Sequence, residues 1–143
     1  MNWLPAPGDF RQSLRTALAA TNPLERLETL ADLAQHHLGF LETIQLDNAL
    51  GKTAATANVP FVQLRLALLS SCTIDHLLPA IRVAGLRRRL LIEVYTGSFG
   101  QYRQELLDPA SALHGFRPDI ILFSLTAREA IAGVPLGATT DEA

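Results

Sequence analysis

The sequence predicts an α/β fold in which an N-terminal helical arm is followed by a three-stranded parallel βαβαβ sheet. Short apolar runs at 64–69, 90–95 and 120–124 have the length and composition of buried strands. Each run ends in a polar or glycine-containing turn, and helical segments separate the runs. The residues before position 58 instead repeat apolar side chains at helical spacing, which predicts the arm.

Three helices are expected in the arm, residues 1–57. The apolar face of the first consists of Phe10, Leu14, Ala17 and Leu18. Asn22 is expected to cap the second helix, with Pro23 in its first position and Glu25 completing a capping box. Gly39 is expected to end the second helix, and Gly51 the third.

The second expected domain, residues 58–143, is reached through a small, polar linker from Thr53 to Pro60. Between its first two strands, Thr73 is expected to cap a helix that runs from Ile74 to about Ala84. Gly85 is expected just past the end of that helix.

A last helix is predicted by the T-x-x-E pattern of Thr126 and Glu129, and it is expected to end near Gly133 and Pro135. Three strands make a small sheet, and a parallel sheet needs both faces covered. The chain is therefore expected to be a partial domain, the first part of a longer protein. Alternatively, the helical arm or a second copy of the chain covers the open edge.

Composition argues for a soluble, cytoplasmic protein. The 143 residues carry a net charge of only −2 and one cysteine, which excludes an intramolecular disulfide and fits a reducing compartment. No signal peptide or membrane-spanning apolar run is evident, and the balanced charge argues against nucleic acid as a partner. The basic run Arg87–Arg89 is interpreted as a solvated edge or partner contact rather than a phosphate patch.

The three turns that follow the strands should share one edge of the sheet, because ligands of parallel α/β sheets bind at the carboxyl ends of the strands. Arg128 is the one obvious cation there, and helix starts near Thr73 and Thr126 also favour negative charge. The expected ligand at this edge is an anion such as a phosphate or carboxylate. Helix caps and glycine turns explain the same residues without any ligand. The expected lining consists of Ser70, Ser71, Thr73, Gly97, Ser98, Gly100, Thr126 and Arg128.

A catalytic reading of this edge rests on Ser70 or Ser71 as a nucleophile, which needs a base within hydrogen-bond reach. His76 is a weak candidate for that base, and Cys72 is more readily a small packed residue than a reactive thiol. The adjacent His36 and His37 lack the spacing of a helical metal pair, so no metal site is predicted.

Several segments together resemble the N-terminal region of FkbH-like proteins, bacterial members of the haloacid dehalogenase superfamily, subfamily IIIC, found in polyketide and related pathways. The resemblance covers nearly the whole chain, including the helical arm. The segments are Leu69–Thr73, Glu93–Tyr95, Gly100–Tyr102, Glu105–Pro109, Ser111–Leu113 and Phe116–Asp119.

The resemblance implies a flavodoxin-like sheet of the SGNH-hydrolase kind and a role beside a phosphatase-like domain. It associates the chain with loading a glyceryl-type unit from a phosphorylated donor onto an acyl carrier protein. The expected partners are therefore the carrier protein or the phosphatase-like domain. The aspartate nucleophile and Mg²⁺ of the family belong to that later domain, so no cofactor is expected here.

The match to SGNH hydrolases themselves is partial. Ser70 or Ser71 matches their nucleophile, and Gly97 or Gly100 matches their glycine block loosely. Their Gly-x-Asn-Asp block corresponds to the Leu-Thr-Ala-Arg of 125–128, which lacks the oxyanion-hole asparagine, and their late Asp-x-x-His block has no match. The favoured function is a noncatalytic recognition or docking module. The alternative is an SGNH-like hydrolase or acyltransferase.

Overall fold

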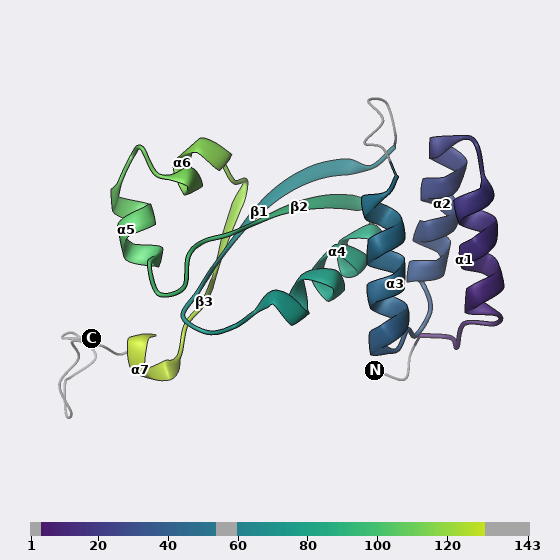
Figure 1. The fold of residues 1–143 in the computed structure, drawn as a ribbon, viewed down its shortest axis with the longest axis horizontal. Helices are drawn as coiled ribbons and strands as arrows, with labels where there is room; N and C mark the ends of the chain where they lie inside the picture. Colours follow the sequence, from purple (N-terminus) through teal and green to yellow (C-terminus); the bar gives the residue numbers. More distant parts are fainter. Residues whose placement is uncertain (1–3, 54–59, 131–143) are drawn as a thin grey trace. The chain divides into compact units, whose positions relative to one another are not determined.

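A computed structural model describes residues 4–53 and 60–130, and it confirms an α/β protein with a parallel sheet. The strands are β1 (Val62–Ser70), β2 (Leu90–Thr96) and β3 (Ile120–Ser124), in the order β2-β1-β3 (Figure 1). β1 and β3 pair in parallel, from Leu66 opposite Ile120 to Ser70 opposite Ser124. All three strands lie where the apolar runs predicted them.

The chain forms two compact units. One contains Met1–Arg65 and Asp75–Glu93, and the other contains Leu66–Ile74 and Val94–Ala143. The expected domain boundary at residues 57 and 58 remains a prediction, and most of the expected linker lies outside the described residues. Within the described parts of the chain, no helix is both long and apolar enough to cross a bilayer.

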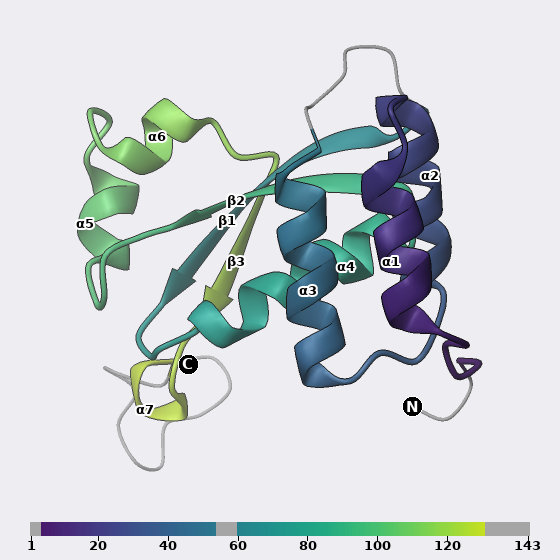
Figure 2. The same cartoon turned by 45° about the vertical axis from the view of Figure 1, so that its right-hand side comes forward.

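Four helices build the first unit: α1 (Phe10–Ala19), α2 (Pro23–Ala34), α3 (Phe40–Gly51) and α4 (Leu78–Leu86). The first three lie side by side, and α4 packs against α3 (Figure 1, Figure 2). Their apolar stripes form one core, because the periodic leucines and alanines of each helix point inward. The fully buried side chains of this core include Leu30, Leu46 and Leu86.

The helix starts of this unit agree in part with those predicted from the sequence. The Asn22 side chain accepts a hydrogen bond from the Leu24 N–H at 2.9 Å, so the predicted cap is confirmed. Glu25 lies in the first turn of α2, where its charge favours the helix start. Gly39 does not end α2, which stops at Ala34. It instead precedes α3, and its N–H donates to Glu42 Oε2 at 2.8 Å.

The predicted start and end of the helix between β1 and β2 are both wrong. A 3₁₀ turn, η1 (Asp75–Leu77), precedes α4, so Thr73 does not cap the helix. Gly85 lies inside α4 rather than past its end. A Cβ on Gly85 would lie 2.5 Å from Ile92 Cδ1, so the glycine is required by the close packing of the helix on β2.

The second unit contains α5 (Tyr102–Leu107), α6 (Ala112–Phe116), β3 and α7 (Ala127–Ala130) beside the second half of β1. Its smaller core joins Ala67 and Leu69 of β1 to Tyr102 and Leu113 of the helices. Leu125 and Tyr95 pack against this cluster. The expected end of the last helix near Gly133 and Pro135 lies outside the described residues.

Candidate functional site

Ser70 ends β1 with its hydroxyl engaged in the turn that follows. The residue is buried, 8% exposed. Its Oγ donates to the Cys72 carbonyl oxygen and accepts from the Cys72 N–H at 2.9 Å. The Cys72 Sγ lies 3.6 Å away, and Cys72 itself is exposed. These bonds are those of a serine turn, in which the side chain satisfies the backbone that leaves the strand.

Ser71 links the end of β1 to the start of α7. Its N–H donates to the Ser124 carbonyl at 3.1 Å, and its Oγ accepts from the Thr126 N–H at 3.2 Å. Glu129 completes the cluster, because one of its oxygens accepts from the Thr126 hydroxyl at 2.9 Å and from the Thr126 N–H at 3.2 Å. The pKa of Glu129 is lowered, first by the Ser71 hydroxyl and then by Thr126. The predicted T-x-x-E pair therefore forms.

The loop Gly97–Gly100 encloses a carboxylate that belongs to the chain itself. Glu105 Oε1 accepts from the Ser98 N–H at 3.1 Å. A Cβ on Gly97 would lie 3.0 Å from that oxygen and 3.0 Å from Leu69 Cδ2, so the glycine admits the close approach. The Glu105 carboxylate thus occupies the Ser98 N–H, a donor in the loop that the sequence analysis predicted would contact a ligand.

Glu105 also fixes the end of β2, because the Tyr95 hydroxyl donates to its Oε2 at 2.5 Å. Burial, and secondly the bond to Glu105, raises the pKa of Tyr95 to about 12. The Gly100 N–H donates to the Ser70 carbonyl at 3.3 Å, and Gly100 has a φ of +69°, which glycine adopts without strain. The glycine loop is therefore attached to the end of β1.

The structure brings most of the predicted residues to the carboxyl ends of β1 and β3, but they fall into two groups. Ser70, Ser71, Gly100 and Thr126 join through the bonds above, and Gly97 and Ser98 surround Glu105. Thr73 and Arg128 are exposed, and neither makes a hydrogen bond or ion pair with the described residues. With respect to the described residues, the Arg128 guanidinium is therefore available to an anion.

A histidine base for either serine is the missing element of the catalytic reading, because none of the hydrogen bonds of the described residues joins a histidine to Ser70 or Ser71. The one histidine of this unit, His114, places Nε2 3.1 Å from the Leu106 carbonyl oxygen. His76 belongs to the other unit. No cluster of side chains in the described residues has the composition of a metal site.

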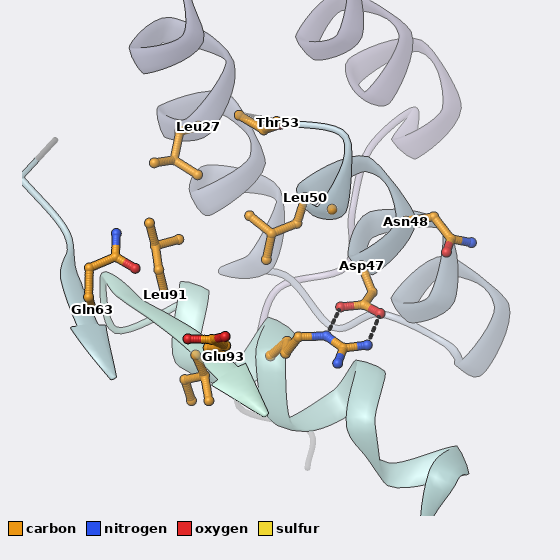
Figure 3. A pocket seen from close by; sticks show the side chains of 11 residues that line it. Leu27, Asp47, Asn48, Leu50, Thr53, Gln63, Leu91 and Glu93 are labelled. Carbon is orange, nitrogen blue, oxygen red and sulfur yellow. Dashed lines mark hydrogen bonds and ion pairs between the residues drawn. The ribbon is translucent and has the colours of Figure 1, made fainter. Parts of the chain in front are cut away.

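A pocket in the first unit was not predicted from the sequence. Its volume is about 390 Å³, which is within the range of small-molecule sites. Leu27, Leu50 and Leu91 supply much of its apolar wall, and Asp47 and Glu93 supply carboxylates at its side (Figure 3). The remaining lining comes from α3, from Thr53 just after it, from α4, and from β1 and β2.

An ion pair organises that pocket. Arg82 donates from Nε and Nη2 to the two oxygens of Asp47, both at 2.7 Å (Figure 3). The bond to Asp47 is also the largest cause of the raised pKa of Arg82. Asp47 is 8% exposed on a face of α3 that also buries Leu46 and Ala49. The one signal of this ion pair in the sequence is that Asp47 lies among the apolar residues of the buried face of α3.

The basic run Arg87–Arg89 serves structural contacts of the first unit. Arg87 Nε donates to the Ala34 carbonyl at 2.6 Å, and burial lowers its pKa. Arg89 donates from Nη1 and Nη2 to the two carboxylate oxygens of Glu28, 2.5 Å at the shorter contact, and its Cζ lies 4.6 Å from the centre of the Phe61 ring. Arg87 and Arg89 are thus engaged within this unit, and the interpretation of the run as a solvated edge or partner contact stays a prediction.

The fold resembles one solved structure of a longer protein. It is the N-terminal part of the protein BF1531 from Bacteroides fragilis, which contains a phosphatase domain complexed with Mg. The match has 23% sequence identity and a TM-score of 0.52, and it covers 66% of this chain but only 23% of that one. No family model and no curated protein matches the sequence. The likeness is therefore one of fold, to a segment of a phosphatase-containing protein.

Proposed function

We propose that this chain is a noncatalytic recognition and docking module of an FkbH-like system. In such a system it acts with a phosphatase-like domain that uses Mg²⁺, and it binds the acyl carrier protein that receives a glyceryl-type unit from a phosphorylated donor. The fold supports this assignment, since the similar structure is the N-terminal part of a protein with a phosphatase domain.

The hydrogen bonding of the two serines is the observation that carries the noncatalytic assignment. A nucleophilic hydroxyl must donate to a base, but Ser70 donates to the carbonyl of its own turn. The Ser71 hydroxyl bonds the Glu129 carboxylate, whose lowered pKa makes it a weaker base, and it accepts from the Thr126 N–H at the start of α7. Both side chains are thus used to build the carboxyl edge of the sheet.

Recognition of the carrier protein would use the anionic phosphopantetheine arm. Arg128 is exposed beside the Ser71 and Thr126 cluster and has no partner among the described residues. Guanidinium groups bind phosphate well because their donors match its oxygens. The arm would therefore lie along the edge formed by Ser70, Ser71, Gly100 and Thr126, with its phosphate at Arg128.

A titration of the chain with carrier protein tests this proposal. Carrier protein that bears the phosphopantetheine arm should bind more tightly than the same protein without it. Arg128→Ala should weaken that binding about tenfold, as loss of one charge-assisted contact predicts. Arg15→Ala, at an exposed position of α1, is the matched control and should bind as the parent does. Equal binding of both carrier forms would contradict the proposed use of the arm.

An ester-hydrolysis assay in parallel tests the hydrolase or acyltransferase alternative. The parent chain, Ser70→Ala and Ser71→Ala should all give the background rate if the module is noncatalytic. Turnover that disappears with either substitution, in a chain that does not bind carrier protein, would assign the serine-dependent activity instead.

A further inference from the structure

The pocket beside the Asp47–Arg82 ion pair belongs to the first unit alone. All the residues that line it fall within Met1–Arg65 and Asp75–Glu93, and they come from three helices and two strands of that unit. Its volume of about 390 Å³ is at the lower end of the range of small-molecule sites. The pocket is therefore a candidate site that is separate from the residues at the carboxyl ends of β1 and β3.

The lining of this pocket divides into covered apolar side chains and exposed polar ones. Leu27 is only 3% exposed, and Leu50 and Leu91 are partly buried beside it (Figure 3). Gln63 and Glu93 are exposed. Small-molecule sites commonly combine an apolar wall with a few polar groups that orient the ligand. A ligand of this pocket is therefore expected to have an apolar body and a polar end.

The charges of the lining specify what that polar end is. The pocket has two carboxylates, Asp47 and Glu93, but Arg82 is the one cationic residue that lines it. Asp47 is 8% exposed, and each of its oxygens accepts one bond from Arg82, although a carboxylate oxygen can accept two. Glu93 Oε2 accepts from Arg65 Nε at 3.3 Å, whereas Glu93 Oε1 accepts no hydrogen bond from the described residues. The pocket therefore has spare acceptors and an excess of negative charge.

We propose that this pocket binds a small organic cation, a protonated amine on an apolar body. The ammonium group donates to the carboxylates of Asp47 and Glu93, because charge-assisted hydrogen bonds are stronger than neutral ones. The apolar body lies against the leucines of the pocket wall. An anionic ligand of the same shape is disfavoured, because its charge would meet two carboxylates while the Arg82 charge is already paired with Asp47. This inference does not depend on binding of a carrier protein.

Titration of the full chain with phenylbutylamine, phenylbutanol and phenylbutanoate tests the proposal, because these probes share one body and differ in the charge of the polar end. The NMR signals of the leucine methyl groups report where each probe binds. The amine should shift the methyl signals of Leu27, Leu50 and Leu91, with a dissociation constant on the order of 1–10 mM for a probe of this size. The alcohol should bind about tenfold more weakly, and the carboxylate more weakly still.

A substitution at the exposed carboxylate tests the charge contact itself. Glu93→Gln keeps the shape of the side chain and should weaken binding of the amine about threefold, as loss of an exposed charge contact predicts, while binding of the alcohol stays unchanged. Glu25→Gln, at an exposed position of α2 outside the lining, is the matched control and should bind the amine as the parent does. Circular dichroism establishes that each variant is folded, and the order of the three probes on the parent decides if Glu93→Gln is not. Equal binding of the three probes, shifts confined to other leucines, or a folded Glu93→Gln variant that binds the amine as the parent does would overturn the proposal.

Discussion

Replacing Gly85 by alanine tests the packing of α4 on β2. The added Cβ would lie 2.5 Å from Ile92 Cδ1, 2.7 Å from Ile92 Cγ1 and 3.3 Å from the Leu90 carbonyl oxygen. The helical preference of alanine favours the substitution by about 1 kcal/mol. Overpacking of a core costs about 1–3 kcal/mol, and the upper part of that range applies here because the Leu90 carbonyl is backbone and the β-branched Ile92 has few χ1 rotamers. The variant should be less stable by about 1–2 kcal/mol.

Urea unfolding at equilibrium measures that difference. Gly51→Ala, at the end of α3, is the matched control: its Cβ would meet nothing within 4 Å, so stability should stay level or rise by up to about 1 kcal/mol. Adding Ile92→Ala to the Gly85 variant removes the clashing atoms, and the pair should couple by about 1 kcal/mol or more. A Gly85→Ala protein as stable as the parent, beside a normal control, would refute the steric argument.

Three further substitutions follow from single interactions. Arg82→Ala leaves the buried Asp47 unpaired and should lower the free energy of unfolding in urea by about 2–3 kcal/mol. This is less than for a fully buried pair, because the Arg82 side chain is about a third exposed. Arg65→Ala, in an exposed pair with Glu93, should lower it by less than about 0.5 kcal/mol. Tyr95 should titrate by ultraviolet absorbance near its raised pKa of about 12, and Tyr95→Phe should remove that step. Its contribution to stability is complete below about pH 10, where the unfolded phenol is also protonated, and is lost as the pH rises through 12. Asn22→Ala should cost about 1 kcal/mol through the lost cap, and equal Tm values for variant and parent would contradict it.

The strands and helix starts could be predicted because their signals are local. A short apolar run flanked by polar turns specified each strand, and an asparagine before a proline specified the start of α2. The misplaced boundaries have distant causes. Gly85 was read as a helix end by residue type, but its position is set by contact with Ile92 on the following strand.

In the candidate site, too, the features with local signals were predicted and those set by distant contacts were missed. The order of strands and turns predicted correctly that the Ser70 and Thr126 turns would meet. The carboxylates that fill this edge were missed, because the Glu105 contacts with Ser98 and Tyr95 depend on how α5 folds back on the end of β2. The pair of Asp47 and Arg82 spans 35 residues, and only the acid within the apolar stripe of α3 hinted at it.

Glu105 and Glu129 act as competitors that are covalently tethered to the donors they occupy. A tethered group acts at an effective concentration of millimolar or more, which a free phosphate in dilute solution does not exceed. A small anion therefore gains little at the Ser98 or Thr126 N–H groups, because it must first displace a carboxylate that cannot diffuse away. A ligand attached to a macromolecule gains from contacts elsewhere on the surface. On the proposed function, the edge is therefore expected to bind an anion that a larger partner carries more tightly than the same anion free in solution.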